Sequence, residues 1–341
     1  MYLEYYGLTT PPFDITPNPR FLFYSAKHRE AFNHLLYGIR ERKGFVQLTG
    51  EVGAGKTTLC RAMLEHLDDH YSTALILNPI MSAEELVKAI AQEYGLSVKG
   101  LDRLETLAAI NDFLLRQVER GKETLLIIDE AQDLTDDLLE QVRLLSNLET
   151  DDRKLLQIIL FGQPELRDRL NNPRLRQLRQ RITVRYHLRP LTRYEVSHYV
   201  QHRIHVSGGN GTPHFTRPAL WRVHHYSQGI PRLVNAVCDK ALLAGFVQQS
   251  DRIDYRMVGR AVRAVASRAS PALRSCAHCQ SRSSARQATI VSVTGIARPR
   301  PRRTYTGAGS TGRKGRLTGG GGVCCCAALA RFRASLIKLM R

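Results

Sequence analysis

Short apolar runs alternate with longer amphipathic segments through the first 190 residues of the chain. The intervening segments carry apolar residues at the three- and four-residue spacing of a helix face, as at 82–94, 101–119 and 135–148. Runs that are apolar throughout are typical of parallel strands covered on both faces. We therefore predict an α/β domain at 25–190, with a five-stranded parallel sheet flanked by helices. The predicted strands are residues 45–49, 73–77, 124–128, 154–161 and 182–188.

Beyond residue 191 the strand-like runs stop, and helical patterns follow one another as far as residue 266. Thr192 and Glu195 have the spacing of a capping box, in which each side chain accepts a hydrogen bond from the other residue's backbone N–H. The sequence predicts a small all-helical lid domain over residues 191–266. Its helices are expected at 192–205, 217–227, 231–246 and 255–266, with glycines in the breaks.

Residues 1–24 are rich in aromatic residues and proline, a composition that favours an extended, well-packed arm over a helix. Ser25 follows as a candidate N-cap, and the helix that it opens is expected to run to about residue 40. This helix would deliver the chain into the first predicted strand.

The net charge of +19 is concentrated in the last quarter of the chain. Residues 268–341 contain fifteen Lys and Arg and no acid, so residues 1–267 hold only four of the nineteen net positive charges. Five of the seven cysteines also lie there, which leaves no disulfide framework in the body and suits a reducing compartment. We predict a disordered, basic, low-complexity tail at 267–341, no transmembrane helix and a cytoplasmic protein.

The strand predicted at 45–49 is followed by Gly-Glu-Val-Gly-Ala-Gly-Lys-Thr and then by a helical segment. The spacing G-x-x-x-x-G-K-T between a strand and a helix predicts a phosphate-binding loop, whose backbone N–H groups surround phosphate oxygens. Lys56 is expected to reach the β- and γ-phosphates of a nucleotide, and the Thr57 hydroxyl to bind Mg²⁺. The predicted cofactor-binding residues here are Gly50, Glu51, Val52, Gly53, Ala54, Gly55, Lys56, Thr57 and Thr58.

Two carboxylates, Asp129 and Glu130, follow the strand predicted at 124–128. Ligands of such sheets bind at the carboxyl ends of the strands, so both side chains are expected at the nucleotide. Asp129 is predicted to hold Mg²⁺ and Glu130 to orient the attacking water, while a cap for the next helix is the alternative. Gln163 follows the strand predicted at 154–161, where a polar residue can sense the γ-phosphate.

Arginines are dense between residues 171 and 185, and two interpretations of them stay open. They form either a solvated surface or a contact with nucleic acid. The mildly charged body counts against strong DNA binding, because DNA-binding domains usually concentrate positive charge on their folded part. The arginines concerned are Arg174, Arg176, Arg179, Arg181 and Arg185.

Further motifs are spread over residues 1–266: Tyr5-Tyr6-Gly7-Leu8, Thr16-Pro17-Asn18-Pro19-Arg20, Asp129-Glu130-Ala131-Gln132 and Gly162-Gln163-Pro164-Glu165-Leu166. With the phosphate-binding loop they resemble the general secretion pathway protein A family of AAA+ ATPases. The resemblance implies an ATP hydrolase on the cytoplasmic side of the bacterial inner membrane. It also implies that the ATPase works with an inner-membrane partner protein. Together they would assemble the type II secretion secretin through the peptidoglycan.

The resemblance also implies roles for single residues. Lys56 and Thr57 stand as the Walker A pair. Asp129 and Glu130 stand as the Walker B pair, and Gln163 occupies the position of sensor 1.

Three arginines receive roles from the same resemblance. Arg232, in Gly229-Ile230-Pro231-Arg232, resembles sensor 2, a lid arginine that reaches the γ-phosphate of the bound nucleotide. Arg181 is predicted to be the arginine finger supplied to a neighbouring subunit, with Arg176 as the alternative. A finger acting in trans predicts a ring or another homo-oligomer with ATP at the subunit interface.

Residues 267–341 depart from the family pattern. Family members often continue into a transmembrane helix and a periplasmic peptidoglycan-binding domain, and this segment resembles neither, so contact with peptidoglycan is not expected. An alternative function is a DNA-associated AAA+ ATPase of the transposition-regulator type. A non-catalytic nucleotide switch is a third hypothesis. The presence of Glu130 counts against it, because a switch could do without this carboxylate.

Overall fold

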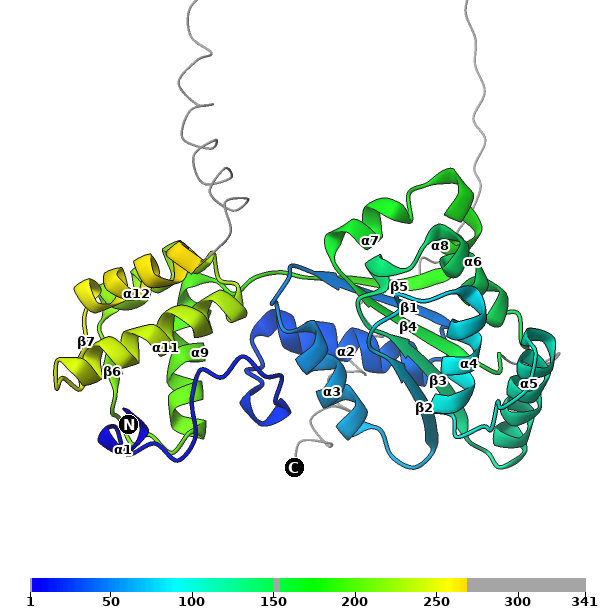
Figure 1. The fold of residues 1–341 in the computed structure, drawn as a ribbon, viewed down its shortest axis with the longest axis horizontal. Coiled ribbons are helices and arrows are strands. Elements are labelled where there is room, and N and C mark those ends of the chain that lie inside the picture. The colour runs from blue at the N-terminus through cyan, green and yellow to red at the C-terminus, as the bar shows by residue number, and fades with distance from the viewer. Residues whose placement is uncertain (1, 150–153, 269–341) are drawn as a thin grey trace, which may run out of the picture. The chain divides into compact units, whose positions relative to one another are not determined.

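The computed structural model describes residues 2–149 and 154–268. The tail predicted at 267–341 therefore lies outside the described residues, apart from its first two positions. Within the described part, the predicted five-stranded parallel sheet is confirmed, with strand order β2-β3-β4-β1-β5 (Figure 1). Its strands are β1 (Phe45–Gly50), β2 (Tyr71–Ile76), β3 (Glu123–Ile128), β4 (Gln157–Gly162) and β5 (Ile182–Leu188).

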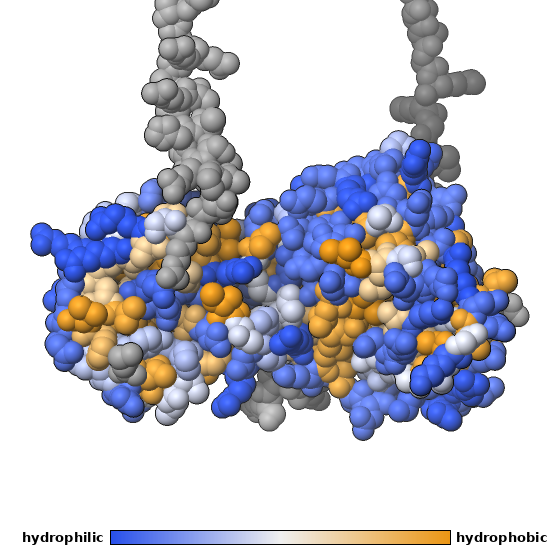
Figure 2. Space-filling model, in the orientation of Figure 1, coloured by the Kyte–Doolittle hydropathy of each residue, from blue (hydrophilic) through white to orange (hydrophobic). Residues whose placement is uncertain are grey.

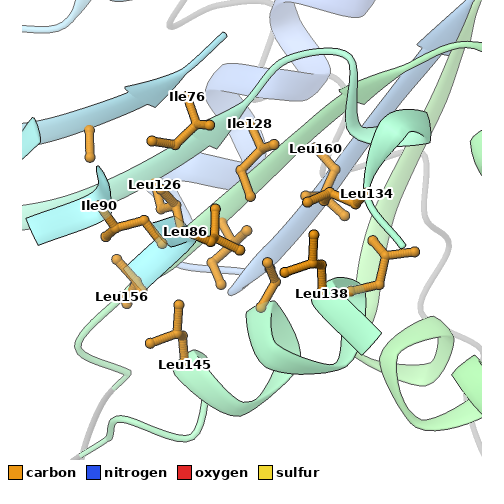
Figure 3. Packing of buried hydrophobic residues seen from close by; sticks show 14 of the residues in the cluster. Ile76, Leu86, Ile90, Leu126, Ile128, Leu134, Leu138, Leu145, Leu156 and Leu160 are labelled. Atoms are coloured by element: carbon orange, nitrogen blue, oxygen red, sulfur yellow. The ribbon is translucent and has the colours of Figure 1, made fainter. Parts of the chain in front are cut away.

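Helices cover both faces of the sheet. Strand residues such as Leu48 and Ile159 are buried against α2 (Ala26–Arg40) and α3 (Lys56–His66). The opposite face carries Leu126 and its neighbours, which pack against the remaining helices of the α/β domain (Figure 3). Those helices are α4 (Ala83–Glu93), α5 (Arg103–Glu119), α6 (Asp136–Leu145), α7 (Pro164–Arg169) and α8 (Arg176–Arg181), together with the short 3₁₀ turns η2 (Ala131–Asp133) and η3 (Pro173–Leu175).

The predicted ends of some of these elements need adjustment. The strand expected from residue 154 starts three residues later as β4, because Lys154 instead forms an isolated antiparallel bridge with Glu149. The helix expected over 135–148 begins after its N-cap Thr135 and ends at Leu145. Strand β5 has the predicted bounds.

The second domain is built mainly from α9 (Arg193–Val206), α10 (Arg217–Ser227), α11 (Pro231–Val247) and α12 (Tyr255–Arg268). The predicted capping box of Thr192 and Glu195 is present at the start of α9. The expectation of an all-helical lid is wrong in one detail, because β6 (His214–Phe215) and β7 (Arg252–Ile253) pair in parallel. Strands of two residues are too short to produce an alternating pattern in the sequence.

The N-terminal arm folds onto the lid. Its side chains Tyr6, Leu8 and Phe13 are buried in one hydrophobic cluster with α9, α10, α11 and α12. The Tyr6 hydroxyl also donates a hydrogen bond to the carbonyl of Leu242, at 3.2 Å. The arm is not wholly extended as expected, since it contains the helix α1 (Tyr2–Tyr5) and the 3₁₀ turn η1 (Pro19–Phe21).

Hydrophilic side chains cover much of the face drawn in Figure 2, and hydrophobic ones show in groups between them. Across residues 2–149 and 154–268, no helix combines the length and the apolar character needed to cross a membrane. The buried apolar residues of these elements form three clusters, two on the sheet faces and one in the lid.

Candidate functional site

The phosphate-binding loop connects the end of β1 to the start of α3. Gly53 and Gly55 have φ angles of +78° and +99°, in the left-handed region that glycine adopts without strain. A side chain at Gly53 would also place its Cβ 2.5 Å from the Cβ of Arg232. No side chain caps the N-terminus of α3, so its first N–H groups are left for an anion such as a phosphate.

Lys56 is the first residue of α3, and its side chain is only 5% exposed. Its ammonium group donates to the carbonyl oxygens of Gly50 and Glu51, at 2.9 and 3.2 Å. Burial lowers the pKa of Lys56, while the nearby carboxylates of Glu130 and Asp129 act in the opposite direction. The loop backbone therefore holds the Lys56 ammonium group in place, within reach of an incoming phosphate.

Asp129 lies directly after β3 and is 2% exposed. One carboxylate oxygen accepts a hydrogen bond from the Thr57 hydroxyl at 2.7 Å, and the other accepts from the backbone N–H of Glu130 at 2.9 Å. Burial raises the pKa of Asp129, and these two hydrogen bonds partly offset that rise. Two hard oxygen ligands thus stand side by side, and this donor set fits Mg²⁺.

Glu130 is held in a strained backbone conformation, with φ +49° and ψ 39°. For a residue other than glycine this left-handed geometry costs about 1–3 kcal/mol, and such strain is concentrated at functional sites. Its carboxylate accepts from the amide of Gln132 at 2.9 Å and from that of Gln163 at 3.3 Å. The Gln132 side chain also accepts from the backbone N–H of Gln163, at 2.9 Å. Two amides therefore fix the Glu130 carboxylate.

The two predicted sensor residues lie close to this centre. Gln163 follows β4 directly, and its amide contacts Glu130 as described. Arg232 is the second residue of α11, and its backbone N–H donates to the carbonyl of Gly53 at 3.2 Å. The Arg232 side chain is exposed and lines the cavity above the loop.

The two candidate finger residues lie elsewhere in the chain. Arg181 ends α8 immediately before β5, and therefore lies at the amino edge of the sheet, opposite the phosphate-binding loop. Its guanidinium donates to the hydroxyl of Ser146 at 2.6 Å. Arg176, at the start of α8, is exposed. Neither arginine lines the cavity above the loop, and the trans role inferred from the sequence stays a prediction.

A cavity of about 340 Å³ opens above the phosphate-binding loop, and we call it the loop cavity. Residues 52–58 form its floor, and Glu130 stands at one side. Residues 14–18 and 21–23 of the arm form one wall, and the lid supplies Tyr199, Arg203 and Asn235. Gly50 and Glu51 do not line the loop cavity, although their carbonyl groups accept hydrogen bonds from Lys56, which does.

His28 supports the loop from α2 and was not found in the sequence as a site residue. It is buried, with Nδ1 2.9 Å from the Ser25 hydroxyl oxygen and Nε2 3.1 Å from the carbonyl oxygen of Ala54. A carbonyl only accepts, so Nε2 carries the hydrogen and Nδ1 accepts from Ser25. Burial lowers the pKa of His28, which favours this neutral form.

Arg203 is a buried cation on α9 that the sequence analysis also missed. Its guanidinium donates to the carbonyl of Pro12, to that of Asp14 at 3.1 Å and to the Tyr199 hydroxyl at 3.0 Å. It also lies over the ring of Phe21, 4.7 Å from the ring centre. Among the described residues Arg203 has no ion pair. Backbone carbonyls and aromatic faces of the arm replace a carboxylate partner.

The fold and the site define the class: this is a P-loop ATPase of the AAA type, and residues 39–170 match the AAA domain family. Over 256 residues, 74% of this chain, the sequence is 49% identical to the general secretion pathway protein A of Aeromonas hydrophila. The resemblance inferred from the sequence is confirmed, and the matched part of the chain is a member of that family. The chain spans about half of this relative, covering 46% of its length.

Solved structures of P-loop ATPases share the fold. The ORC2 protein of Aeropyrum pernix, in ADPNP-ADP complexes, has a TM-score of 0.55 and 19% identity, covering 74% of this chain and 71% of that chain. The Walker-type ATPase of Pyrococcus abyssi has a TM-score of 0.54 and 18% identity, with 80% of each chain covered. Drosophila ORC bound to DNA has a TM-score of 0.56 and 15% identity, covering 79% and 69%. At such identities the likeness shows the fold alone.

Proposed function

We propose that this protein hydrolyses ATP in a Mg²⁺-dependent reaction and uses the cycle to drive assembly or remodelling of a bacterial envelope machine of the secretion type. The observation that carries the hydrolysis is the Glu130 carboxylate, oriented by two amides next to the pair formed by Thr57 and Asp129. A non-catalytic switch needs no carboxylate that is fixed in this way.

The reaction follows from the chemistry of these side chains. Glu130 orients a water molecule and accepts its proton while the water oxygen bonds to the γ-phosphorus and the bond to the bridging oxygen breaks. Lys56 exchanges its carbonyl partners for phosphate oxygens, which neutralises charge that develops on the leaving group. Thr57 and Asp129 would hold Mg²⁺, which when bound screens the charge of the β- and γ-phosphates.

The lid and the arm give the reaction a mechanical output. Arg232 contacts the loop backbone and faces the loop cavity, so the presence of a γ-phosphate changes what its side chain can bind. Gln163 couples the same phosphate to β4 and Glu130. Because residues 6–13 of the arm pack on the lid, a change of lid angle moves that part of the arm with it. The arm and lid are therefore the surfaces that we expect to act on a partner.

Arg181 is proposed to complete the site of a neighbouring subunit, so that the active form is a homo-oligomer such as a ring. The expected partner is an inner-membrane secretion protein, as the family suggests, and the protein is placed on the cytoplasmic side of that membrane. Nucleic acid is the alternative partner, by way of the arginines near α8.

Mixing two inactive variants tests the trans arrangement. Lys56→Ala removes nucleotide contacts but keeps Arg181, whereas Arg181→Ala keeps the loop and removes the finger. If the finger acts in trans, each variant alone is inactive and an equimolar mixture regains part of the ATPase activity. Activity of Arg181→Ala equal to wild type, at the same oligomeric state, would remove Arg181 from this role.

A second measurement separates the proposed machine from the alternative. The ATPase rate is measured with and without duplex DNA at low and high salt, and the protein is also used to capture partners from membrane extract. Strong, salt-sensitive stimulation by DNA would favour the DNA-associated alternative, because phosphate contacts weaken steeply as salt rises. Capture of an inner-membrane secretion protein that depends on ATP would support the envelope function.

A further inference from the structure

A second cavity of about 310 Å³ lies beside the edge of the sheet formed by β1 and β5, and we call it the edge cavity. It shares no lining residue with the loop cavity. Residues of β1, β5, α7 and α8 line it, and no acid is present among the described residues that do so. Two of its arginines, Arg179 and Arg185, belong to the arginine-dense stretch 171–185, whose pattern in the sequence fits either a solvated surface or a nucleic-acid contact.

Three arginines, Arg167, Arg179 and Arg185, surround this cavity with little compensation. Arg167 lies 3.8 Å from Asp168, in a pair whose two side chains are mostly exposed, so the pair is weak. Arg179 donates to the amide oxygen of Asn171 at 3.2 Å, and Arg185 donates to the backbone carbonyl of Arg179. Each guanidinium has five N–H donors, so most donors here have no protein acceptor among the described residues.

Arg169, in the same region, is an arginine whose charge is neutralised by an acid. Its guanidinium pairs with Asp136 at 2.9 Å and also donates to the carbonyl of Gln132 at 2.8 Å. The chain thus has acids near α7 for neutralising arginines, but none of them lines the edge cavity.

Gln47 supplies an independent sign of a ligand. It is 4% exposed and lines the edge cavity from β1, and its amide nitrogen Nε2 has no hydrogen-bond partner in the part of the chain that the structure describes. A buried donor without a partner is costly and calls for an acceptor. The strand register places Gln47 beside Arg185, so the unpaired amide and the guanidinium come from neighbouring positions.

The two polar residues farther along the same strands complete this wall. Thr49 and His187 also pair in register, and the Thr49 hydroxyl oxygen lies 3.1 Å from Nδ1 of His187. Burial, and secondarily Arg167, lower the pKa of His187, so the positive charge of the edge cavity comes from its arginines. The edge cavity therefore combines positively charged guanidinium groups with neutral polar side chains of β1 and β5.

We propose that the edge cavity binds a small oxyanion of the phosphate class, such as phosphate or pyrophosphate, held by Arg179, Arg185 and the amide of Gln47. A guanidinium group can donate two parallel hydrogen bonds to the oxygens of a phosphate. Several guanidinium groups around one cavity offer more N–H donors than a carboxylate can accept, so a phosphate is the better ligand. The volume is at the lower end for ligand pockets, which fits a small anion. This site is separate from ATP hydrolysis and does not depend on it.

Calorimetric titration of pyrophosphate into the full chain tests the site. All variants carry Lys56→Ala, so that the phosphate-binding loop contributes little, and all keep the same tail. We expect this background to retain one binding event per chain. Adding Arg179→Gln or Arg185→Gln should weaken the event at least tenfold. Gln47→Leu should weaken it severalfold without any change in charge, after circular dichroism has confirmed that this variant folds.

Arg174→Gln is the matched control, because it removes the same charge from an exposed arginine that does not line the edge cavity. We expect its pyrophosphate affinity to stay within twofold of the background. If Arg174→Gln weakens binding as much as Arg185→Gln does, the anion feels only the net charge and the proposal is overturned. Absence of any binding event in the background overturns it too.

Competition distinguishes the sources of the anion. Displacement of bound pyrophosphate by inorganic phosphate alone identifies a free anion, whereas displacement by phosphatidylglycerol vesicles identifies a lipid headgroup. Both outcomes support a phosphate-class site. The opposite result is that Arg185→Gln leaves pyrophosphate binding unchanged but weakens binding of duplex DNA. The edge cavity would then be part of a nucleic-acid surface, and the proposal of a small-anion site would be wrong.

Discussion

The two walls of the loop cavity hold their charges in different ways. On the sheet side, Lys56 follows the loop after β1, while Asp129 and Glu130 follow β3, and β4 lies between these two strands. Each of the three side chains lies within a short network of hydroxyl, amide or backbone groups. On the arm and lid side, Arg203 is buried without an acid and is held by carbonyl groups and aromatic rings. The sheet wall is therefore organised for chemistry, and the opposite wall is organised to keep two distant segments of the chain together.

The largest expected effect concerns the sheet wall. Glu130→Gln keeps the size of the side chain but removes the group that accepts a proton from water. We expect turnover to fall by about 10²–10⁴-fold, the usual contribution of a general base, while the affinity for ATP changes little. Steady-state ATPase assays and binding of a fluorescent ATP analogue measure the two quantities. Glu119→Gln, at the exposed last residue of α5, is the control, and unchanged turnover of Glu130→Gln would contradict the assignment.

Lys56→Ala should weaken ATP binding rather than act on turnover alone. The lysine gives charge-assisted hydrogen bonds to phosphates, worth about 1.5–3 kcal/mol, so the dissociation constant should rise roughly 10- to 150-fold. Equilibrium binding of the same analogue measures the change. Lys88→Ala, whose side chain only pairs with Glu84 on the surface of α4, should leave binding unaltered. An equal loss in both variants would show that the loop lysine has no special contact.

The arm and lid wall can be broken at Arg203. Arg203→Ala leaves the carbonyls of Pro12 and Asp14 without their donor, so the free energy of unfolding should fall by about 1–3 kcal/mol. The arm should also become more susceptible to proteolysis. Urea denaturation and limited proteolysis measure these effects, with the exposed Arg20→Ala as control. If the arm of Arg203→Ala resists protease as well as wild type does, Arg203 does not fasten it.

The smallest expected effect is the pH response of His28. Burial lowers its pKa below the ordinary 6.5, so the folded state favours the neutral ring. Its contribution to stability is present above pH 6.5 and is lost as the pH falls through the lower folded-state pKa. The stability advantage of wild type over His28→Gln, about 1 kcal/mol for the Ala54 hydrogen bond, should therefore shrink between pH 7 and 5. Thermal unfolding over this range measures it, and a constant difference would contradict the prediction.

The sequence predicted the sheet wall well because its signals are local. An apolar run followed by glycines and a lysine, or by two carboxylates, indicates both the strand and the position of these side chains at its end. Their chemical roles stay predictions. Strand β5 and helix α10 have the predicted bounds for the same reason. The start of β4 was missed because Lys154 belongs to a tight bridge with Glu149, which apolar content does not reveal.

The arm and lid wall could not be predicted from local patterns, because the residues that contact each other there are far apart along the chain. Arg203 binds carbonyl groups 189 and 191 residues earlier, and backbone acceptors leave no trace in the residue types. His28 supports a carbonyl 26 residues later, and its local pattern is that of any buried helix residue. Gln132 was part of a quoted motif, but only the folded chain shows that its amide holds Glu130.

The packing of the arm on the lid also has a consequence for protein synthesis. The arm leaves the ribosome before the α/β domain and the lid, yet its burial partners extend to Ala261 in α12. At a translation rate of about 5–20 residues per second, roughly 12–50 seconds separate the arm from the helix that covers it. During that interval Tyr6 and Phe13 stay exposed while the α/β domain can already fold. This part of the arm is thus made early but buried late, and a nascent chain stalled within the lid should present it to chaperones.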